Sequence, residues 1–310
     1  MLTLNVAITL LAGLSAATPT KRAAPVDGIA GYATLNGGTT GGAGGATTTV
    51  TTLAALRSAV AGTSPKVVKI SGIITGDGKV VDVGSETTVL GAGSDSGLIG
   101  GGFRVKNGKN VIIRNLRLSK SPAPTDLIGL QNATNVWIDH NTFTSDLDHG
   151  KDFYDGQCDI THASDFVTVS WNVFTEHFKV SLVGHLTTTV PRTLAIQGHL
   201  PSQLFPTCQL PSSFPPLRHI YNNYFKNVLN SGVDSRDGAQ TLVENVLLPI
   251  ETALNGGFAV QRNNLLINTT MDSDLVQGTL TTVPYTYTLD EASTIAEIVA
   301  KSAGAGVITF

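Results

Sequence analysis

The segments IDHNTF (residues 138–143), VSWNVF (169–174) and IYNNYF (220–225) share one pattern. In each segment a β-branched residue is followed after two positions by Asn and after one more position by Phe. The first two Phe residues are 31 positions apart, and the second interval is 51. Related apolar segments lie at 111–118 and 239–248, with no helical pattern between the repeats. Short β-branched runs of this kind argue against alternating strand–helix units.

The repeat predicts a solenoid of stacked strands, an all-β parallel β-helix in which equivalent side chains of successive turns form ladders. Asn suits the bend of such a turn because it tolerates left-handed backbone and hydrogen-bonds the backbone of the neighbouring turn. The repeated Asn residues are therefore expected to be structural and not catalytic.

The open ends of a solenoid need covers. Residues 51–62 place Leu53, Leu56 and Val60 on one helical face, which predicts a short capping helix at the N-terminal end. Residues 291–304 predict a second short helix, packed along the body at the other end. The Gly/Thr-rich stretch 36–50 has the composition of a linker, and we expect an ordered loop there.

The N-terminus has the features of a secretory leader. An apolar run is followed by Ser15, Ala16 and Ala17, which predicts a signal peptide over residues 1–17. Lys21 and Arg22 suggest a short pro-segment over 18–22, leaving residues 23–310 as a single domain. No later stretch approaches the roughly 20 apolar residues of a membrane helix. The protein is thus expected to be secreted and extracellular, without a membrane partner.

The composition allows a large core: 41% of the residues are hydrophobic and 14% are charged, with a net charge of -3. This small net charge argues against a nucleic-acid partner. We also expect a monomer. The two cysteines, Cys158 and Cys208, allow at most one disulfide, and we predict none.

The 51-residue interval between repeats is long enough for two turns with one repeat missing. A shifted reading frame of residues 196–205 could encode the missing pattern, with its Phe at position 205, which is 31 residues after Phe174 and 20 before Phe225. We therefore interpret residues 186–218 as a segment translated out of frame. The alternative is a genuine divergent loop.

One stretch is much richer in aspartate than the rest of the chain: TSDLDHGKDFYDGQCDITHASD (144–165). Asp155 and Asp159 are four residues apart, so on an extended strand their carboxylates point to the same side. Converging carboxylates repel one another unless they are protonated or share a cation, and oxygen-only ligands favour Ca²⁺. Alone, such a loop is more often solvated surface.

The stretch NVWIDHNTFTSDLDHGKDFYDGQCDITHASDFVTVSWNVFTEHFKVSLVGH (135–185) resembles the secreted fungal pectate lyases of polysaccharide lyase family one. The resemblance extends through GYATLNGGTTGGAGG, RHIYNNYF, GVDSRDGAQTLVEN and TLTTVPYTYTLDEAS, from about Gly31 to Ser293. It implies a right-handed parallel β-helix that cleaves de-esterified polygalacturonate (pectate) by β-elimination with Ca²⁺, in plant cell-wall degradation.

The resemblance also assigns roles to residues of this chain. The Ca²⁺ ligands of the family fall on Asp146, Asp155 and Asp159, with Asp148 as a fourth candidate. The lysine that binds the substrate carboxylate falls on Lys179, and His177 is expected to face the same groove. Without the surrounding motif, Lys179 would be interpreted as a solvated lysine on a strand.

The resemblance fails at the catalytic base. The family pattern resembles R-x-P-x-x-R-F-G and precedes GHIYNNYF, whereas this chain has QLPSSFPPLRHIYNNYF. Gln209 and Phe214 occupy the two arginine positions, and Arg218 is nearby but out of register. Glutamine cannot act as a proton acceptor in place of arginine. No catalytic base is intact, and we predict little or no lyase activity for this chain.

Four alternatives remain open from the sequence. A pectin lyase would carry basic and aromatic residues where Asp155 and Asp159 stand. A glycoside hydrolase on a similar β-helix would use a pair of carboxylates. A catalytically dead polygalacturonate-binding protein would keep the groove and lack the base. The product of a damaged gene would lack one rung of the solenoid.

Overall fold

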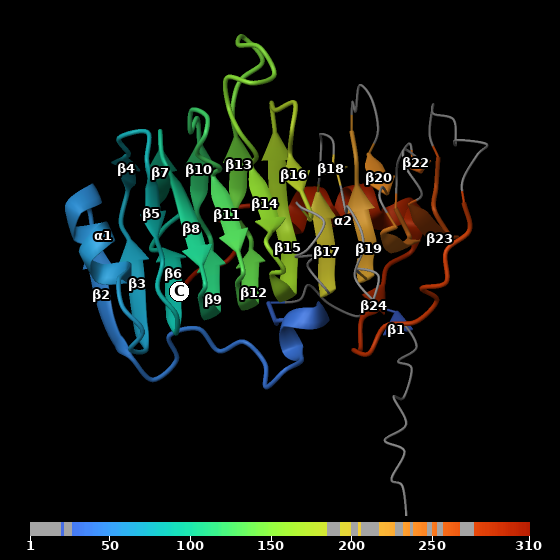
Figure 1. The fold of residues 1–310 in the computed structure, drawn as a ribbon, viewed down its shortest axis with the longest axis horizontal. Helices are drawn as coiled ribbons and strands as arrows, with labels where there is room; N and C mark the ends of the chain where they lie inside the picture. The colour runs from blue at the N-terminus through green and yellow to red at the C-terminus, as the bar shows by residue number, and fades with distance from the viewer. Residues whose placement is uncertain are drawn as a thin grey trace, which may run out of the picture.

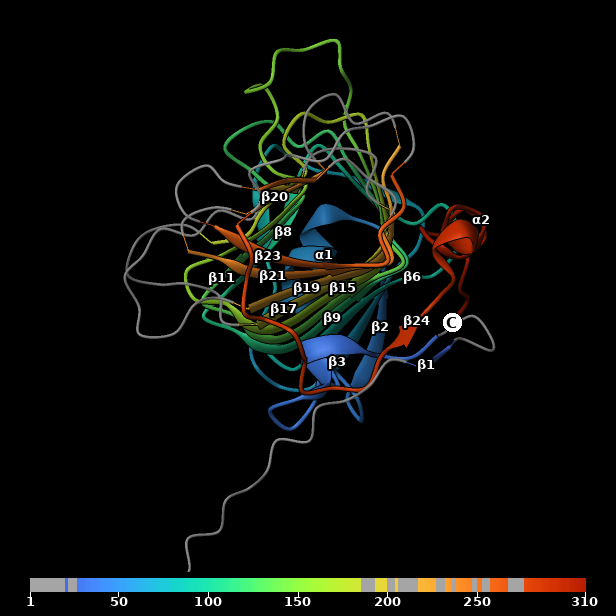
Figure 2. The ribbon, with the colours of Figure 1, turned by 90° about the vertical axis from the view of Figure 1, so that its right-hand side faces the viewer.

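The computed structural model describes residues 27–184, 217–226, 232–235, 238–246, 257–266 and 276–310 in full, and the backbone alone of 20–21, 193–199, 204–205 and 250–252. These residues form a parallel β-helix (Figures 1 and 2), as the sequence predicted. Every ladder between the strands of its three faces is parallel, for example β12 with β9 and with β15. Two short helices flank the body, which confirms the predicted fold class.

The strands of the first face follow one another along the solenoid axis. They are β2 (Ala46–Val50), β3 (Lys66–Ile70), β6 (Thr87–Gly91), β9 (Lys109–Arg114), β12 (Thr134–Asp139), β15 (Asp165–Thr175), β17 (Thr193–His199), β19 (Leu217–Tyr224), β21 (Gln240–Glu244) and β23 (Phe258–Arg262). The second face joins the end of β15 and contains β4 (Ile73–Thr75), β7 (Gly97–Ile99), β10 (Arg117–Ser119) and β13 (Thr142–Thr144).

The third face carries the candidate site. It contains β5 (Val80–Asp82), β8 (Gly102–Lys106), β11 (Ile128–Gln131) and β14 (Cys158–Thr161). A bridge from Ile160 to Val183 continues it toward β16 (Ser181–Leu182), β18 (Leu204–Phe205), β20 (Val233–Ser235) and β22 (Ile250–Thr252). Outside the three faces, β1 (Thr20–Lys21) pairs with β24 (Thr288–Leu289).

Ladders of identical or similar side chains fill the interior. Val111, Val136 and Val167 occupy equivalent positions of β9, β12 and β15, and all three are fully buried. Phe143 and Phe174 of the repeated motif stack in parallel with ring centroids 4.4 Å apart. Cys158 of β14 also belongs to this core and is a free thiol, whereas Cys208 lies outside the described residues.

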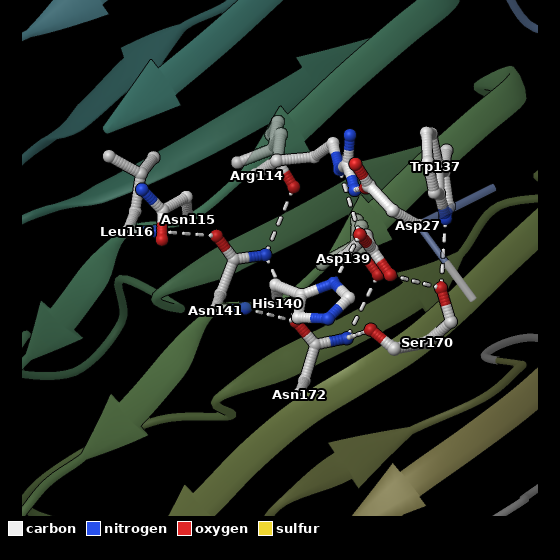
Figure 3. Close-up of polar contacts among 12 residues, drawn as sticks. Asp27, Arg114, Asn115, Leu116, Trp137, Asp139, His140, Asn141, Ser170 and Asn172 are labelled. Carbon is white, nitrogen blue, oxygen red and sulfur yellow. Dashed lines mark hydrogen bonds and ion pairs between the residues drawn. The ribbon is translucent and has the colours of Figure 1, made fainter. Parts of the chain in front are cut away.

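The repeated Asn residues bind the backbone of neighbouring turns, as predicted. Asn141 donates from Nδ2 to the Ile113 carbonyl, and its Oδ1 accepts from the Leu116 amide (Figure 3). Asn172 repeats this one turn later by accepting from the Asn141 amide. The left-handed residue, however, is the one before the motif Asn, for example His140 with φ 51°. The motif Asn therefore serves through its amide side chain and not through its backbone conformation.

Both predicted helices are present. Helix α1 (Leu53–Val60) covers the N-terminal end and buries Leu56 and Val60, while Thr52 caps its first turn by accepting from the Ala55 amide. Helix α2 (Ile295–Ser302) buries Ile295 and Val299 and packs along the body beside β19. Short 3₁₀ turns, η1 (Gly31–Thr34) and η2 (Ala292–Thr294), accompany the terminal segments.

The Gly/Thr-rich stretch is ordered, as expected, because it is tied to the first face. The Gly41 amide donates to Asn110 Oδ1 at 2.7 Å, and the Gly42 amide donates to Thr88 Oγ1 at 2.8 Å. These bonds fix the chain before β2 begins.

The anomalous interval contains a rung of the first face. Strand β17 pairs with β15 on one side and β19 on the other, although both ladders have irregular register. In the sequence as given, Val169 pairs with Ile196, and Phe205 pairs with Leu182 on the third face. Leu194 and Ile196, at alternate positions, continue the pairing of Val167 and Val169. The motif Phe at position 205 belongs to the shifted reading frame and stays a prediction. The reading frame of 186–218 stays a prediction, since 185–192, 200–203 and 206–216 lie outside the described residues.

A buried ionic network lies on the outer side of the first face (Figure 3). Asp139 is fully buried and accepts from Arg114 Nε at 2.7 Å and from Ser170 Oγ at 2.6 Å. The guanidinium of Arg114 lies over the Trp137 ring, 4.2 Å from its centroid, and also donates to Asp27. This network ties the segment at residue 27 to the solenoid.

The predicted leader (1–17) and most of the pro-segment (18–22) lie outside the described residues. Within the described part of the chain, neither helix has the length and apolar character needed to cross a bilayer.

Candidate functional site

Three carboxylates gather at one edge of the third face. Asp159 lies on β14, Asp155 precedes that strand, and Asp126 precedes β11. The Leu182 amide donates to Asp159 Oδ1 at 3.0 Å, and the Gly156 amide donates to Asp126 Oδ1 at 3.0 Å. Asp126 and Asp159 are partly buried, and the side chain of Asp155 is 38% exposed. The group is therefore reachable from solvent but partly desolvated.

Burial and mutual repulsion of the carboxylates determine the pKa values in this group. Burial, followed by the charge of Asp155, raises the pKa of Asp126 to about 7. Burial, followed by the charge of Asp126, raises the pKa of Asp159 well above its usual value. Only Lys179 acts in the opposite direction as a charge in both cases. A carboxyl cluster whose pKa values rise for these reasons is stabilised by an added cation.

Lys179 lies beside the cluster, between β15 and β16. Its Nζ is 3.6 Å from Asp155 Oδ1 and 3.3 Å from Asp152 Oδ1, and its side chain is 35% exposed. The lysine predicted to bind substrate is thus brought to the predicted acidic site. In this structure it is paired with two aspartates of the chain itself.

The donor set fits a hard cation such as Ca²⁺, because all its side-chain ligands are oxygens. Space is also reserved for the carboxylate of Asp159: a Cβ on Gly156 would lie 2.1 Å from its Oδ1. Among the described residues, however, no three acidic, His or Cys side chains already converge as a formed metal site.

The structure adds Asp126 to the two aspartates that the spacing predicted. In the register of the third face, Ile128 pairs with Cys158, so Asp126 lies one rung from Gly156. Aligning the short segment DLIGL with GQCDI would have revealed this neighbour, but the repeat analysis used only the Asn–Phe motif of the first face. That motif contains no information about the third face.

Asp146 has partners of its own. Its carboxylate accepts from the Tyr154 hydroxyl at 2.6 Å, lies 2.6 Å from His149 Nδ1 and is 3.3 Å from Lys120 Nζ. The bonds from Tyr154 and His149 hold the pKa of Asp146 well below its usual range. Asp146 therefore anchors the loop before β14 and would have to give up these contacts to bind a cation. Asp146 and Asp148 as ligands stay predictions.

His177 does not line an open groove. Its side chain is buried, with 5% exposed, and burial lowers its pKa to about 4. A neutral imidazole beneath the loop contributes shape and not positive charge at neutral pH. Its predicted role in substrate binding stays untested.

Arg218 lies inside the solenoid, away from the acidic cluster at the surface. It is 1% exposed and occupies the interior position that Val167 and Val136 hold in earlier turns. Its Nη2 donates to the Val183 carbonyl at 2.8 Å, inside the solenoid. The side chain of Arg218 therefore lies in the core and not at the surface. Gln209 and Phe214, at the positions of the family arginines, lie outside the described residues.

The fold and site together define a class, a parallel β-helix protein with a candidate cation site on one face. Comparisons with known proteins identify the family. A family model described as pectate lyase matches residues 1–308. The probable pectate lyase A of Aspergillus fumigatus is 45% identical over 95% of both chains, and pectate lyase A of Emericella nidulans is 43% identical over 94% of this chain and 93% of its own.

Solved structures agree with this assignment. The pectate lyase Bsp165PelA from Bacillus sp. N165, crystallised with trigalacturonate, superposes with a TM-score of 0.80 at 28% identity, over 91% of this chain and 100% of its own. The chain belongs to the pectate lyase family, whose members are polysaccharide-degrading enzymes.

Proposed function

We propose that this chain binds de-esterified polygalacturonate through a Ca²⁺ ion held by Asp126, Asp155 and Asp159. The carboxylate cluster is the observation that carries this proposal, because three oxygen-donor side chains lie at one edge of the third face with Lys179 beside them. The trigalacturonate complex of the similar Bacillus enzyme supports an acidic saccharide as the ligand.

The family reaction is a β-elimination on the uronate ring. A base removes the hydrogen at C5, the electron pair forms the C4–C5 double bond, and the oxygen at C4 leaves. The difficulty is that negative charge develops next to the C6 carboxylate, which is already an anion. A bound Ca²⁺ would supply positive charge at that carboxylate.

Residues of the chain itself would support this step. Lys179 would exchange its contacts with Asp152 and Asp155 for the substrate carboxylate, which places a second positive charge there. Burial keeps the imidazole of His177 neutral above about pH 4, so it would not compete as a cation. These roles concern binding and charge, and neither residue supplies the missing base.

With residues 186–218 as given, the chain is proposed to bind pectate with little or no cleavage. Glutamine at 209 cannot accept the C5 proton, and Arg218 is buried in the core. The chain would then be a pectate-binding protein without lyase activity, and the buried position of Arg218 is the observation that favours this. Secretion through the leader at 1–17 and a monomeric state belong to the same proposal.

The decisive experiment compares two chains on polygalacturonate, with and without Ca²⁺. One is the literal chain, and the other has residues 186–218 replaced by the sequence of a corrected reading frame established from the transcript. We expect unsaturated product, followed by its ultraviolet absorbance, only from the corrected chain with Ca²⁺. Full turnover by the literal chain would overturn the assignment of the base. Absence of Ca²⁺-dependent pectate binding by both chains would overturn the proposed function.

A further inference from the structure

The bend between β11 and β12 carries a short motif that neither the solenoid core nor the cation site uses. Residues 132–134 read Asn-Ala-Thr, which is the Asn-x-Ser/Thr pattern with a residue other than proline in the middle. Asn132 lies at the bend with φ 50° and is exposed, whereas Ala133 is buried. The bend therefore presents an asparagine to solvent and turns its neighbour inward.

The equivalent bends of the neighbouring rungs have the same backbone without the same motif. Asn107 stands one rung earlier, with φ 53°, and is exposed, while Lys109 pairs in register with Thr134. His162 holds the left-handed position one rung later, also with φ 53°. The left-handed bend explains a preference for Asn, but it sets no requirement on the residue two positions later. The threonine at 134 therefore distinguishes the rung of Asn132 from its neighbours.

The side-chain amide of Asn132 can carry a substituent without losing its contact with the fold. Its Nδ2 donates one hydrogen to Asn107 Oδ1 at 2.9 Å, at the surface of the molecule. An asparagine amide has two hydrogens, and the bond to Asn107 occupies one of them. Replacement of the other hydrogen by a sugar would therefore preserve this bond between the two rungs.

Space for a bulky group is available beside this bend. On the side of the preceding rung, Asn107 borders an open hollow of about 380 Å³, which Gly62 and Lys106 also line. The candidate cation site lies at the other edge of the third face, because Asp126 precedes β11 and Asn132 follows its four residues. A strand rises about 3.3 Å per residue, so the two are on the order of 15 Å apart. A group on Asn132 would thus leave the cation site open.

We infer that Asn132 is an N-glycosylation site, which receives an oligosaccharide as the chain passes through the secretory pathway. The inference goes beyond the proposed function and depends on one part of it, secretion through the leader. The donor is an oligosaccharide carried on a lipid diphosphate. Asn132 Nδ2 forms a bond to C1 of the first sugar and loses one proton. The bond between C1 and the diphosphate oxygen breaks, and its electron pair leaves with that oxygen.

The test is peptide mapping of the full chain, expressed with its own leader in a glycosylating fungal host. Peptide-N-glycosidase in heavy-oxygen water converts a glycosylated asparagine to a labelled aspartate, so mass spectrometry scores residue 132 by itself. This separates it from the Asn-Thr-Thr sequence at 268–270, which lies outside the described residues. We expect the label at Asn132 in the wild-type chain. Thr134→Val, which keeps the shape of the side chain, should abolish the label, and Thr134→Ser should retain it.

Lys109→Thr gives a test of opposite sign. It completes an Asn-Gly-Thr sequence that begins at Asn107, with the new hydroxyl in the register position of Thr134, so Asn107 should gain the label. Asn107→Gln is the matched control and should leave the label at Asn132 unchanged. An unlabelled Asn132 on a wild-type chain that has entered the secretory pathway would overturn the inference alone. A chain that stays in the cytosol with its leader attached would overturn the proposed secretion and the inference with it.

Discussion

Two buried or half-buried aspartates, Asp139 on the first face and Asp159 on the third, occupy very different surroundings. Asp139 accepts from Arg114 Nε and Ser170 Oγ and lies 2.6 Å from His140 Nδ1. Asp159 accepts a hydrogen bond from the Leu182 amide, and its charged neighbours include Asp126 and Asp155. The first carboxylate is balanced by residues of the chain, whereas the proposed cation would balance the second among the described residues.

This difference separates a structural polar cluster from a candidate site. A buried charge with a full set of partners holds elements together, and a partly buried charge among like charges costs stability unless a ligand compensates it. Such a cost is expected at functional sites.

The largest effect is expected from Arg114→Ala, which removes the cation from Asp139. An uncompensated buried carboxylate should lower the free energy of unfolding by about 3–5 kcal/mol. Urea denaturation followed by circular dichroism measures this change. Arg117→Ala is the control, because Arg117 is 46% exposed and pairs with exposed Asp95, and its effect should stay within about 0.5 kcal/mol. Similar losses in the two variants would mean that the Asp139 network does not stabilise the fold.

The next effect concerns Asp159→Asn. The wild-type chain should gain about 2.7 kcal/mol of stability when Ca²⁺ is present at a hundred times its dissociation constant, and the variant should lose most of that gain. Without Ca²⁺ the variant should be at least as stable as wild type, because one repelling charge is gone. Thermal unfolding with Ca²⁺ or with chelator tests both statements. Asp152→Asn, at a loop residue that is 69% exposed, should keep the Ca²⁺ effect. If it abolished the effect equally, the ligand assignment would be wrong.

Gly156→Ala should act on the site without changing any charge. A Cβ at this position would lie 2.1 Å from Asp159 Oδ1, so the carboxylate must move. Ca²⁺ affinity should fall by about tenfold, as for other changes that reposition metal ligands. Gly150→Ala in the same loop meets nothing within 4 Å and is the matched control. Equal affinities in both variants, measured by calorimetry, would remove Asp159 from the site.

The last prediction is a pH dependence of the Ca²⁺-free chain. The pKa of Asp126 in the fold is about 7, above the value of about 3.9 for an unfolded chain. A carboxyl with a raised pKa stabilises the fold fully below the unfolded value, and its contribution is lost as the pH rises through the folded value. Stability should therefore fall between about pH 4 and pH 7, and Asp126→Asn should flatten this fall. An unchanged slope in the variant would assign the dependence to other groups.

Much of the fold was predictable from three six-residue repeats, because each apolar column of a solenoid imposes the same residue type on every turn. The proximity of Asp155 and Asp159 was predictable from their spacing, although only Asp159 lies on β14. Asp126 was missed because it reaches the site through the register of a different face, about 30 residues away in sequence. The position of Arg218 became clear only when its side chain was placed in a valine column.

The free thiol of Cys158 provides a built-in probe of how often strand β14 opens. Burial raises the pKa of this thiol well above its usual value, and a thiol reagent attacks only the exposed thiolate. In a Cys208→Ser background, the labelling rate of Cys158 would report how often the rung next to Asp159 opens. A cation that bridges the acidic cluster should lower the labelling rate of Cys158. This rate would then report the occupancy of the site in the absence of substrate and of catalysis.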